Sequence, residues 1–227
     1  MAGHIFVSPT EFTAPDGLPT VSVARTAPLP GAIFDWAAES LPKGTVSKWI
    51  DLTGSYTLSG TAVESQWPIS TGSSVTFDGV NDRIDGTFPT GSGRTLVVVA
   101  RATVVANSHR IFGSGTGSNP FHFGMNSNSS RWIFDGGATI AGPTSKTPDT
   151  NWHVFVIALN GSSSVFAVDG EEWTGDTGAA LGGSIRVGAS ATAYFGSEVK
   201  RIALLPRVAN QAERDGLYSS MVAHYGL

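Results

Sequence analysis

The chain has 227 residues, a net charge of −4 and no cysteine. Glycine contributes 28 residues and only 14% of residues are charged, which disfavours helical bundles and coiled coils, because these need many Glu, Lys and Arg residues. The 41% of hydrophobic residues disfavours a disordered chain, and the lack of cysteine excludes disulfides, cysteine-ligated zinc and thiol catalysis.

Residues 1–32 contain five prolines separated by Thr and Ser residues. Proline lacks the N–H that a central strand donates, so an extended N-terminal arm is predicted here. A flexible leader and an arm that docks on a neighbouring subunit are both open, and we favour docking because free ends fray unless they are held. The remainder, 33–227, is expected to form one domain.

Short apolar or alternating runs follow from about residue 33 to residue 206, separated by clusters of Gly, Ser, Asn and Asp. This pattern is typical of an all-β sandwich or barrel. Two runs, Leu96–Ala100 and Val154–Leu159, are continuous and are expected to be buried on both faces. Asn160–Ser163 and Val168–Glu171 predict tight turns, because Asn-Gly and Asp-Gly tolerate the positive φ that such turns require.

The last part of the chain changes to a helical period, which predicts a helix over 210–225. Asn210 is the expected N-cap, Glu213 completes a capping box, and Gly226 is the expected stop. The apolar face of this helix comprises Tyr218, Met221, Val222 and Tyr225.

Five stretches follow one another in an order known from a protein family. They are VSKWIDLTG at 46–54, SVTFDGVNDRI at 74–84, WHVFV at 152–156 with VFAVDG at 165–170, IRVG at 185–188 with FGSEV at 195–199, and the closing segment 205–218. Together they resemble laminin-G-like, concanavalin A-like jelly-roll domains over roughly residues 33–225. The resemblance implies a two-sheet antiparallel jelly-roll sandwich with a short C-terminal helix.

The chain departs from that family at Lys200 and Arg201, where acidic residues are frequent, and this weakens any metal-binding role of that strand. The fold hosts sugar binding, sugar cleavage, adhesion and scaffolding, so the resemblance does not settle function.

The motifs of sugar-cleaving and nucleophilic enzymes do not occur in the sequence. Laminarinase-type members of the fold carry carboxylates two residues apart on one strand, close to the spacing that a retaining mechanism needs. The nearest acidic group, Asp169, Glu171 and Glu172, falls at a predicted turn, where solvated carboxylates are the favoured interpretation. There is no Gly-x-Ser-x-Gly elbow, and the five histidines stand apart. We therefore predict that the protein is not an enzyme.

One loop offers hard oxygen ligands close together, at Asp78, Asn81, Asp82 and Asp85. These residues are the candidates for a structural calcium ion, the only cofactor considered. The competing interpretation is a turn in which Asx side chains bind their own backbone, and we favour it because one loop seldom supplies about six ligands.

Glycan binding needs an exposed aromatic ring with polar neighbours. Trp132 and Trp173 are the candidates for this platform, with Asn126 and Asn128 as hydrogen-bonding partners. For both rings we favour burial in the core or at its rim over a ligand platform, because tryptophan is highly buried on average. Packing is expected for two tryptophans in core-like family positions, Trp49 and Trp152.

The basic residues form no face or stripe, so nucleic-acid binding is not expected. The longest apolar run is too short to cross a bilayer, so membrane insertion is not expected either. The first residues, MAGHIFVSPTEF, lack the features of a secretory signal, and we expect none.

These features, with the small laminin-G-like proteins that the chain resembles, predict a non-enzymatic surface protein of a tailed-bacteriophage virion. It would be a minor tail or head-decoration protein, assembled in the host cytoplasm and located on the virion surface. Residues 1–32 would dock on other virion proteins, the sandwich would bind a host-surface glycan, and homo-oligomers are a further expectation. Two alternatives stay open: a carbohydrate-binding or adhesion module of a bacterial surface protein, extracellular or on the cell surface, and a polysaccharide-degrading enzyme with an atypical site.

Overall fold

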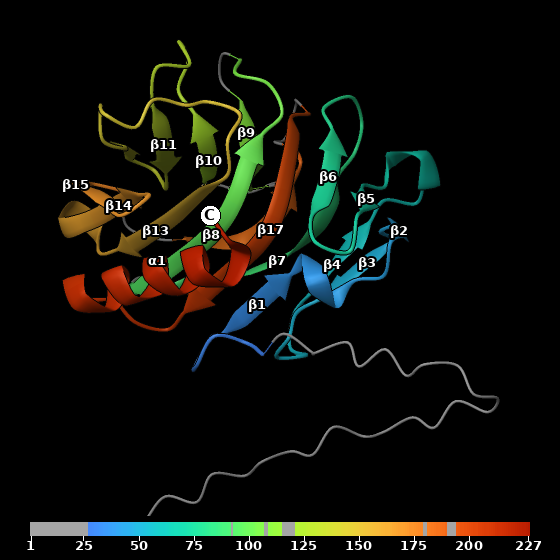
Figure 1. Ribbon diagram of the computed structural model, residues 1–227, viewed down its shortest axis with the longest axis horizontal. Coiled ribbons are helices and arrows are strands. Elements are labelled where there is room, and N and C mark those ends of the chain that lie inside the picture. Colours follow the sequence, from blue (N-terminus) through green and yellow to red (C-terminus); the bar gives the residue numbers. More distant parts are fainter. Residues whose placement is uncertain (1–26, 92, 107–108, 115–120, 179–180, 190–193) are drawn as a thin grey trace, which may run out of the picture.

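The computed structural model describes residues 27–91, 93–106, 109–114, 121–178, 181–189 and 194–227. Two antiparallel sheets pack face to face, and a single helix in this part of the chain, α1 (Gln211–Tyr225), lies on the outer face of one of them (Figure 1). The predicted all-β sandwich with a short C-terminal helix is therefore confirmed. Most of the predicted arm, residues 1–26, lies outside the described residues.

Sheet A has nine strands among the described residues. In spatial order they are β15 (Glu171–Gly175), β14 (Ser164–Val168), β13 (His153–Leu159), β8 (Arg94–Ala102), β17 (Gly196–Leu205), β6 (Val75–Asp78), β5 (Ile69–Ser70) and β2 (Gly44–Thr45), and β1 (Phe34–Ala37) also pairs with β17. The strands β13, β14 and β15 follow one another along the chain, whereas the central neighbours β13, β8, β17 and β6 are distant in sequence.

Sheet B has eight strands among the described residues. In spatial order they are β12 (Thr139–Ala141), β11 (Trp132–Asp135), β10 (His122–Met125), β9 (Arg110–Gly113), β16 (Leu181–Val187), β7 (Ile84–Gly91), β4 (Thr57–Gly60) and β3 (Lys48–Ile50). Short 3-10 turns occur at η1 (Ala38–Ser40), η2 (Glu64–Gln66) and η3 (Gly161–Ser163).

The two continuous apolar runs are buried on both faces, as predicted, because they form the central strands β8 and β13 of sheet A. Leu96 and Val98 face the aromatic core between the sheets. Val97 and Val99 alternate with them and face outward, where α1 covers them. Strands with one apolar face would have left the underside of the helix without a partner.

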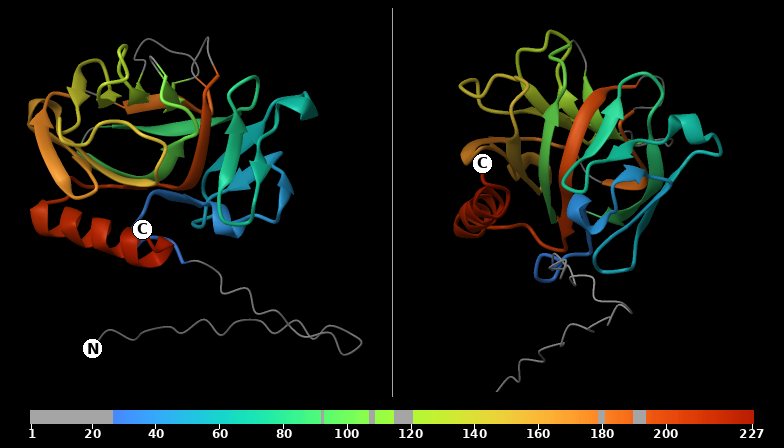
Figure 2. Two further views of the ribbon diagram at one scale, coloured as in Figure 1. Left: turned by 45° about the horizontal axis from the view of Figure 1, so that its top comes forward. Right: turned by 45° about the vertical axis from the view of Figure 1, so that its right-hand side comes forward.

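The helix α1 begins and ends where the sequence predicts. The side chain of Asn210 accepts from the backbone N–H of Glu213, the reciprocal bond is present, and Gly226 takes the left-handed conformation with φ 66°. Met221 is fully buried against the outer face of sheet A, and both views in Figure 2 place the helix outside the sandwich. Burial of such a side chain contributes roughly 1.5–3 kcal/mol to the packing. No helix in the described part of the chain is long and apolar enough to cross a membrane.

Both predicted turns connect neighbouring strands of sheet A. Asn160–Ser163 joins β13 to β14 through η3, with Gly161 at φ 56°. Asp169 and Gly170, at φ 49° and 80°, join β14 to β15. A Cβ at position 170 would lie 3.1 Å from the Tyr218 ring, so the lack of a side chain also lets α1 approach this turn.

Candidate glycan-binding site

Trp132 is part of the core, as the favoured interpretation of burial predicts, and its candidacy as a glycan-binding platform is wrong. Its side chain is fully buried, and its ring lies parallel to Phe123 and edge-on to Phe155, with centroids 6.4 and 5.0 Å away. The cause is register: Trp132 pairs with Met125 of β10, another core residue, so both side chains face the interior. A ring in this position presents no face to a sugar.

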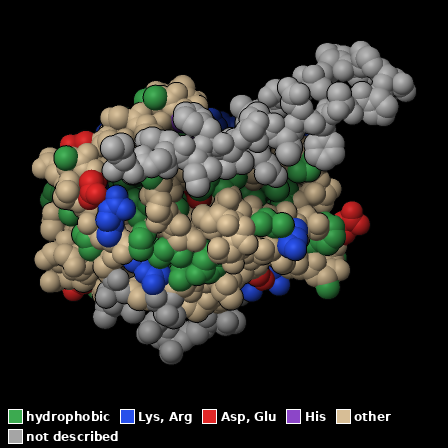
Figure 3. All heavy atoms as spheres, turned by 90° about the horizontal axis from the view of Figure 1, so that it is seen from below, with side chains coloured by type: hydrophobic (Ala, Val, Ile, Leu, Met, Phe, Trp, Pro, Cys, Tyr) green, Lys and Arg blue, Asp and Glu red, His purple; other side chains and the backbone are tan. Residues whose placement is uncertain are grey.

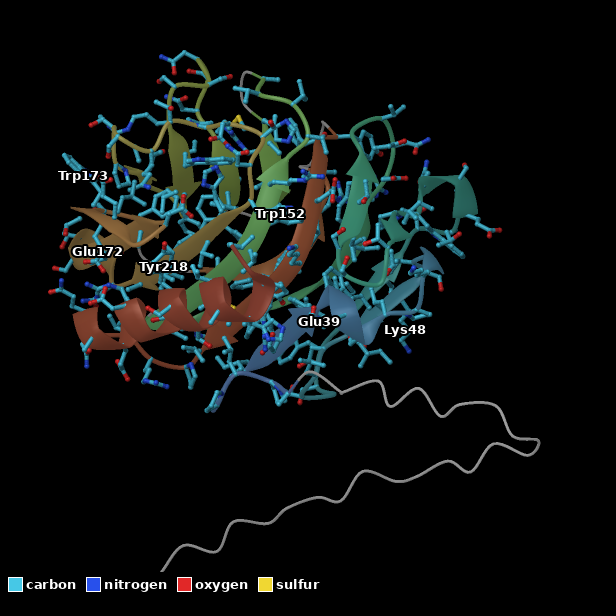
Figure 4. The ribbon with its side chains drawn as sticks, viewed as in Figure 1. Glu39, Lys48, Trp152, Glu172, Trp173 and Tyr218 are labelled. Atoms are coloured by element: carbon cyan, nitrogen blue, oxygen red, sulfur yellow. The ribbon has the colours of Figure 1, made fainter. Side chains whose placement is uncertain are left out.

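Trp173 is exposed, as predicted, with 49% of its surface accessible. It pairs with Phe166 of β14 and so shares the face that points toward the core. Because β15 is the edge strand of sheet A, the indole passes beyond the end of the core and stays in contact with solvent. The guanidinium carbon of Arg131, from the other sheet's side of the sandwich, lies 5.5 Å from its ring centroid. Figure 4 shows Trp173 at this outer edge, beside Glu172 and far from Lys48.

Arg131 connects the predicted glycan-binding residues to one another. Its backbone N–H donates to the side-chain oxygen of Asn126 at 3.2 Å, and its Nε donates to the carbonyl of Gly142 at 2.9 Å. The side chain therefore reaches Trp173 from a fixed position. Asn128 lies farther along the same turn and accepts from the N–H of Ser130 at 3.2 Å. The structure thus brings Asn126 and Trp173 to one arginine, whose role the sequence did not indicate.

We call this surface the end patch (Asn126, Asn128, Arg131, Glu171, Trp173). Glu171 lies two residues before Trp173 on β15, on the same side of the strand, and its carboxylate accepts from the hydroxyl of Ser145. The patch combines an aromatic ring, a cation, two amides and a carboxylate. These are the groups that stack on the C–H face of a sugar and exchange hydrogen bonds with its hydroxyls.

An ion pair on the opposite side of β15 holds the edge strand in place. Two of the three guanidinium nitrogens of Arg214 on α1, Nε and one terminal nitrogen, donate to the carboxylate of Glu172, at 2.6 and 2.7 Å. The hydrogen bond to Glu172 raises the pKa of Arg214, although burial opposes it. The three carboxylates Asp169, Glu171 and Glu172 have different partners and do not converge on one site. Asp169 lies in the predicted turn, whereas Glu171 and Glu172 are the first residues of β15.

The predicted calcium ligands form a turn. One oxygen of Asp78 accepts from the N–H groups of Val80, Asn81 and Asp82, at 2.8, 3.1 and 3.2 Å. Burial raises the pKa of Asp78, but these bonds more than offset it and the pKa is lowered. Asp85 instead faces Arg186, whose Nε lies 2.8 Å away. No group of three or more His, Cys, Asp or Glu residues able to hold a metal occurs among the described residues, so the calcium ion stays a prediction without a ligand set.

The two histidines that lie in strands have carboxylate partners. His153 is nearly buried, with Nδ1 at 2.7 Å from Asp169 and Nε2 at 3.0 Å from Asp149. Burial lowers the pKa of His153, but the bonds and charges of the two aspartates outweigh it and raise the pKa. Both ring nitrogens are engaged, so the ring ties the segment before β13 to the β14–β15 turn. His122, on β10, alternates with the core residue Phe123, faces away from the core and lies 3.9 Å from Asp135.

A shallow groove lies between α1 and the segment before β1. Its lining is mainly apolar, and its volume of 260 Å³ falls below the roughly 300–1,000 Å³ of typical ligand pockets. Figure 3 shows that side of the molecule, with hydrophobic side chains among scattered charges. It offers few hydrogen-bonding groups, so the end patch is the better candidate for a sugar.

No family model matches the chain, and no curated protein is significantly similar to it in sequence. Solved structures are similar in fold. A sialidase of Trypanosoma rangeli in complex with sialic acid matches with a TM-score of 0.64 and 16% identity, over 86% of this chain and 34% of the sialidase chain. The binding domain of botulinum neurotoxin serotype G matches with a TM-score of 0.60 and 12% identity, over 84% of this chain and 51% of that chain.

These comparisons contradict the prediction that the protein is not an enzyme, because the similar structures include several chains of a sialidase, which is an enzyme. The absence of carboxylate triplets and serine elbows therefore does not exclude one. The chain spans only about a third to a half of the chains it matches, and identities this low show a shared fold alone. That fold is compatible with the concanavalin A-like resemblance, and neither match provides a link to a bacteriophage.

Proposed function

We propose that the protein binds a glycan through the end patch. The observation that carries this proposal is Trp173, a half-exposed indole held against the guanidinium of Arg131. A ring fixed in this way loses little conformational freedom when a sugar stacks on it, so little of the binding energy is offset by ordering. The similarity in fold to a sialidase solved with sialic acid supports a sugar as the ligand, and the similarity to a toxin binding domain supports a binding role.

The test is binding of the full chain to an array of bacterial wall, capsular and sialylated glycans, followed by calorimetry on the best ligand. Trp173→Ala should weaken binding at least tenfold, about 1.4 kcal/mol, because it removes the stacking surface. Val80→Ala, at another exposed apolar position, is the control and should bind as the wild type does. Wild-type protein that binds no glycan, or a Trp173→Ala variant that binds normally, would contradict the proposal.

The narrower role, a surface protein of a tailed-phage virion docked by residues 1–32, stays a prediction that rests on the sequence features alone. Antibody labelling of intact virions tests it, and light scattering of the purified chain tests the expected homo-oligomer. Cleavage of a polysaccharide also stays open, and release of shorter sugars from a bound glycan would reveal it.

A further inference from the structure

A second cluster of polar and aromatic side chains lies on the outer face of sheet A, beyond the part that α1 covers. Strand register places it: Arg101 of β8 pairs with Glu198 of β17, which pairs with Thr76 of β6. Trp152 lies opposite Arg101 in the same row, because β13 and β8 are antiparallel and the adjacent residues His153 and Ala100 pair with each other. Figure 4 shows Trp152 over the middle of sheet A, away from the edge that carries the end patch.

Two cations lie against Trp152. The guanidinium carbon of Arg101 is 5.1 Å from the centroid of its ring, and the ammonium of Lys200 is 4.5 Å away. Lys200 also lies 5.3 Å from the ring of Tyr225 at the end of α1. Packing was expected for Trp152, and its ring does pack against the outer apolar cluster, but the side chain stays half-buried with both cations beside it.

Both cations have donors without an acceptor in the described part of the chain. One terminal nitrogen of Arg101 donates to Glu198 at 2.6 Å, but its Nε is buried without a partner. Lys200 makes neither a hydrogen bond nor an ion pair with any described residue. Burial lowers the pKa of Lys200, and the charge of Arg101 lowers it further against the opposing carboxylates. Partly desolvated donors of this kind are normally satisfied by a protein group, water or a ligand.

The nearby carboxylates are engaged elsewhere. Glu198 also accepts from the hydroxyl of Ser74 at 3.2 Å. Glu39 accepts from the hydroxyl of Tyr225 at 3.0 Å and lies 2.8 Å from the ring nitrogen of His224. Neither carboxylate is within ion-pair distance of Lys200. The donors of Lys200 and Arg101 that have no partner can therefore bind an anionic acceptor.

We propose that this face, the Trp152 site (Thr76, Arg101, Trp152, Glu198, Lys200), binds a saccharide that carries a carboxylate. The carboxylate accepts from Lys200 and Arg101, and the C–H face of the sugar ring lies along the exposed part of the indole. Glu198 and the hydroxyl of Thr76 then face the sugar hydroxyls. A simple anion would satisfy the cations and leave the indole and the hydroxyl without a role, so an acidic sugar fits the surface better.

The experiment is calorimetry of the full chain with an oligosaccharide that contains glucuronate, with its neutral glucose counterpart, and with sulfate. We expect the acidic oligosaccharide to bind at least tenfold more tightly than the neutral one, and to bind more weakly at high salt. Lys200→Gln and Arg101→Gln should each lower the affinity for the acidic oligosaccharide at least tenfold. Lys48→Gln makes the same charge change on exposed β3 of sheet B and should have no effect.

Three outcomes would overturn the proposal. They are equal affinity for the acidic and neutral oligosaccharides, equal affinity of the Lys200→Gln and Lys48→Gln variants for the acidic oligosaccharide, or binding of sulfate without binding of either oligosaccharide. Trp173→Ala distinguishes this site from the end patch. It should leave binding of the acidic oligosaccharide unchanged at the Trp152 site, so either proposal can fail while the other stands. Circular dichroism of each variant shows whether the fold is kept.

Discussion

Arg201→Met removes one partner of a buried ion pair that joins two strands of sheet A. Arg201 of β17 and Asp35 of β1 are almost completely inaccessible, and two nitrogens of the arginine donate to the two carboxylate oxygens at 2.8 and 2.6 Å. Asp35 also accepts from the N–H of Leu29 at 2.6 Å, and Arg201 donates to the carbonyl of Ala27 at 3.0 Å. One pair therefore fixes both β1 and the segment that leads into it.

The variant should lose much of the stability of the fold. Methionine fills part of the space of the arginine stem but leaves the carboxylate of Asp35 buried with too few donors. Removing one partner of a buried pair costs about 3–5 kcal/mol. For a chain of this size each kcal/mol lowers the melting temperature by about 2–4 °C, so a decrease of roughly 6–20 °C is expected.

Urea unfolding followed by tryptophan fluorescence measures the loss. Arg207→Met is the matched control, because Arg207 pairs with Glu213 at 3.0 Å on the surface with half of its side chain exposed, and such pairs contribute less than about 1 kcal/mol. The double variant Asp35→Leu with Arg201→Met should recover most of the stability, since it leaves no unpaired charge. Equal losses in the Arg201 and Arg207 variants would refute the reasoning.

Three further predictions concern the helix cap, the buried histidine and one glycine. Asn210→Ala should cost about 1 kcal/mol in urea unfolding, because the first turn of α1 loses its cap, and an unchanged midpoint would contradict this. Because the pKa of His153 is raised, the stabilisation from its protonated ring is complete below about pH 6.5 and is lost as the pH rises through the raised pKa. The difference in free energy of unfolding between the wild type and His153→Gln should therefore shrink from pH 6 to pH 9. A difference that grows over this range would contradict the prediction. Gly188→Ala should cost at least about 2 kcal/mol, because the position has φ 82° and a Cβ would overlap the ring of Phe77; thermal melting at wild-type temperature would show that the site can adapt.

The elements that the sequence predicted correctly depend on neighbouring residues. The cap of α1 needs only Asn210 and Glu213, three positions apart, and Gly226 supplies the left-handed residue that ends the helix. The turn at Asp169 and Gly170 is equally local, because the positive φ of both residues is a property of the dipeptide. The continuous apolar strands also predicted their own burial on both faces.

The candidate site could be predicted only in part. Trp132 and Trp173 each follow a charged residue, Arg131 and Glu172, and local sequence did not distinguish them. Pairing with Met125 turns Trp132 into the core, whereas the position of β15 at the edge of sheet A leaves Trp173 in solvent. The contact between Trp173 and Arg131 joins segments that are distant in the chain, so no local signal indicated it.

The sequence by itself determined the all-β class, the positions of the turns and the C-terminal helix, because periodicity, capping and glycine chemistry act within a few residues of one another. Only the tertiary structure decided which aromatic rings are exposed and which charges meet. Lys200 and Trp152 show why: their contact depends on the order of β17, β8 and β13 in sheet A, and that order is set by the packing of the whole sandwich. A surface formed by residues from several strands can therefore be identified only from the tertiary structure.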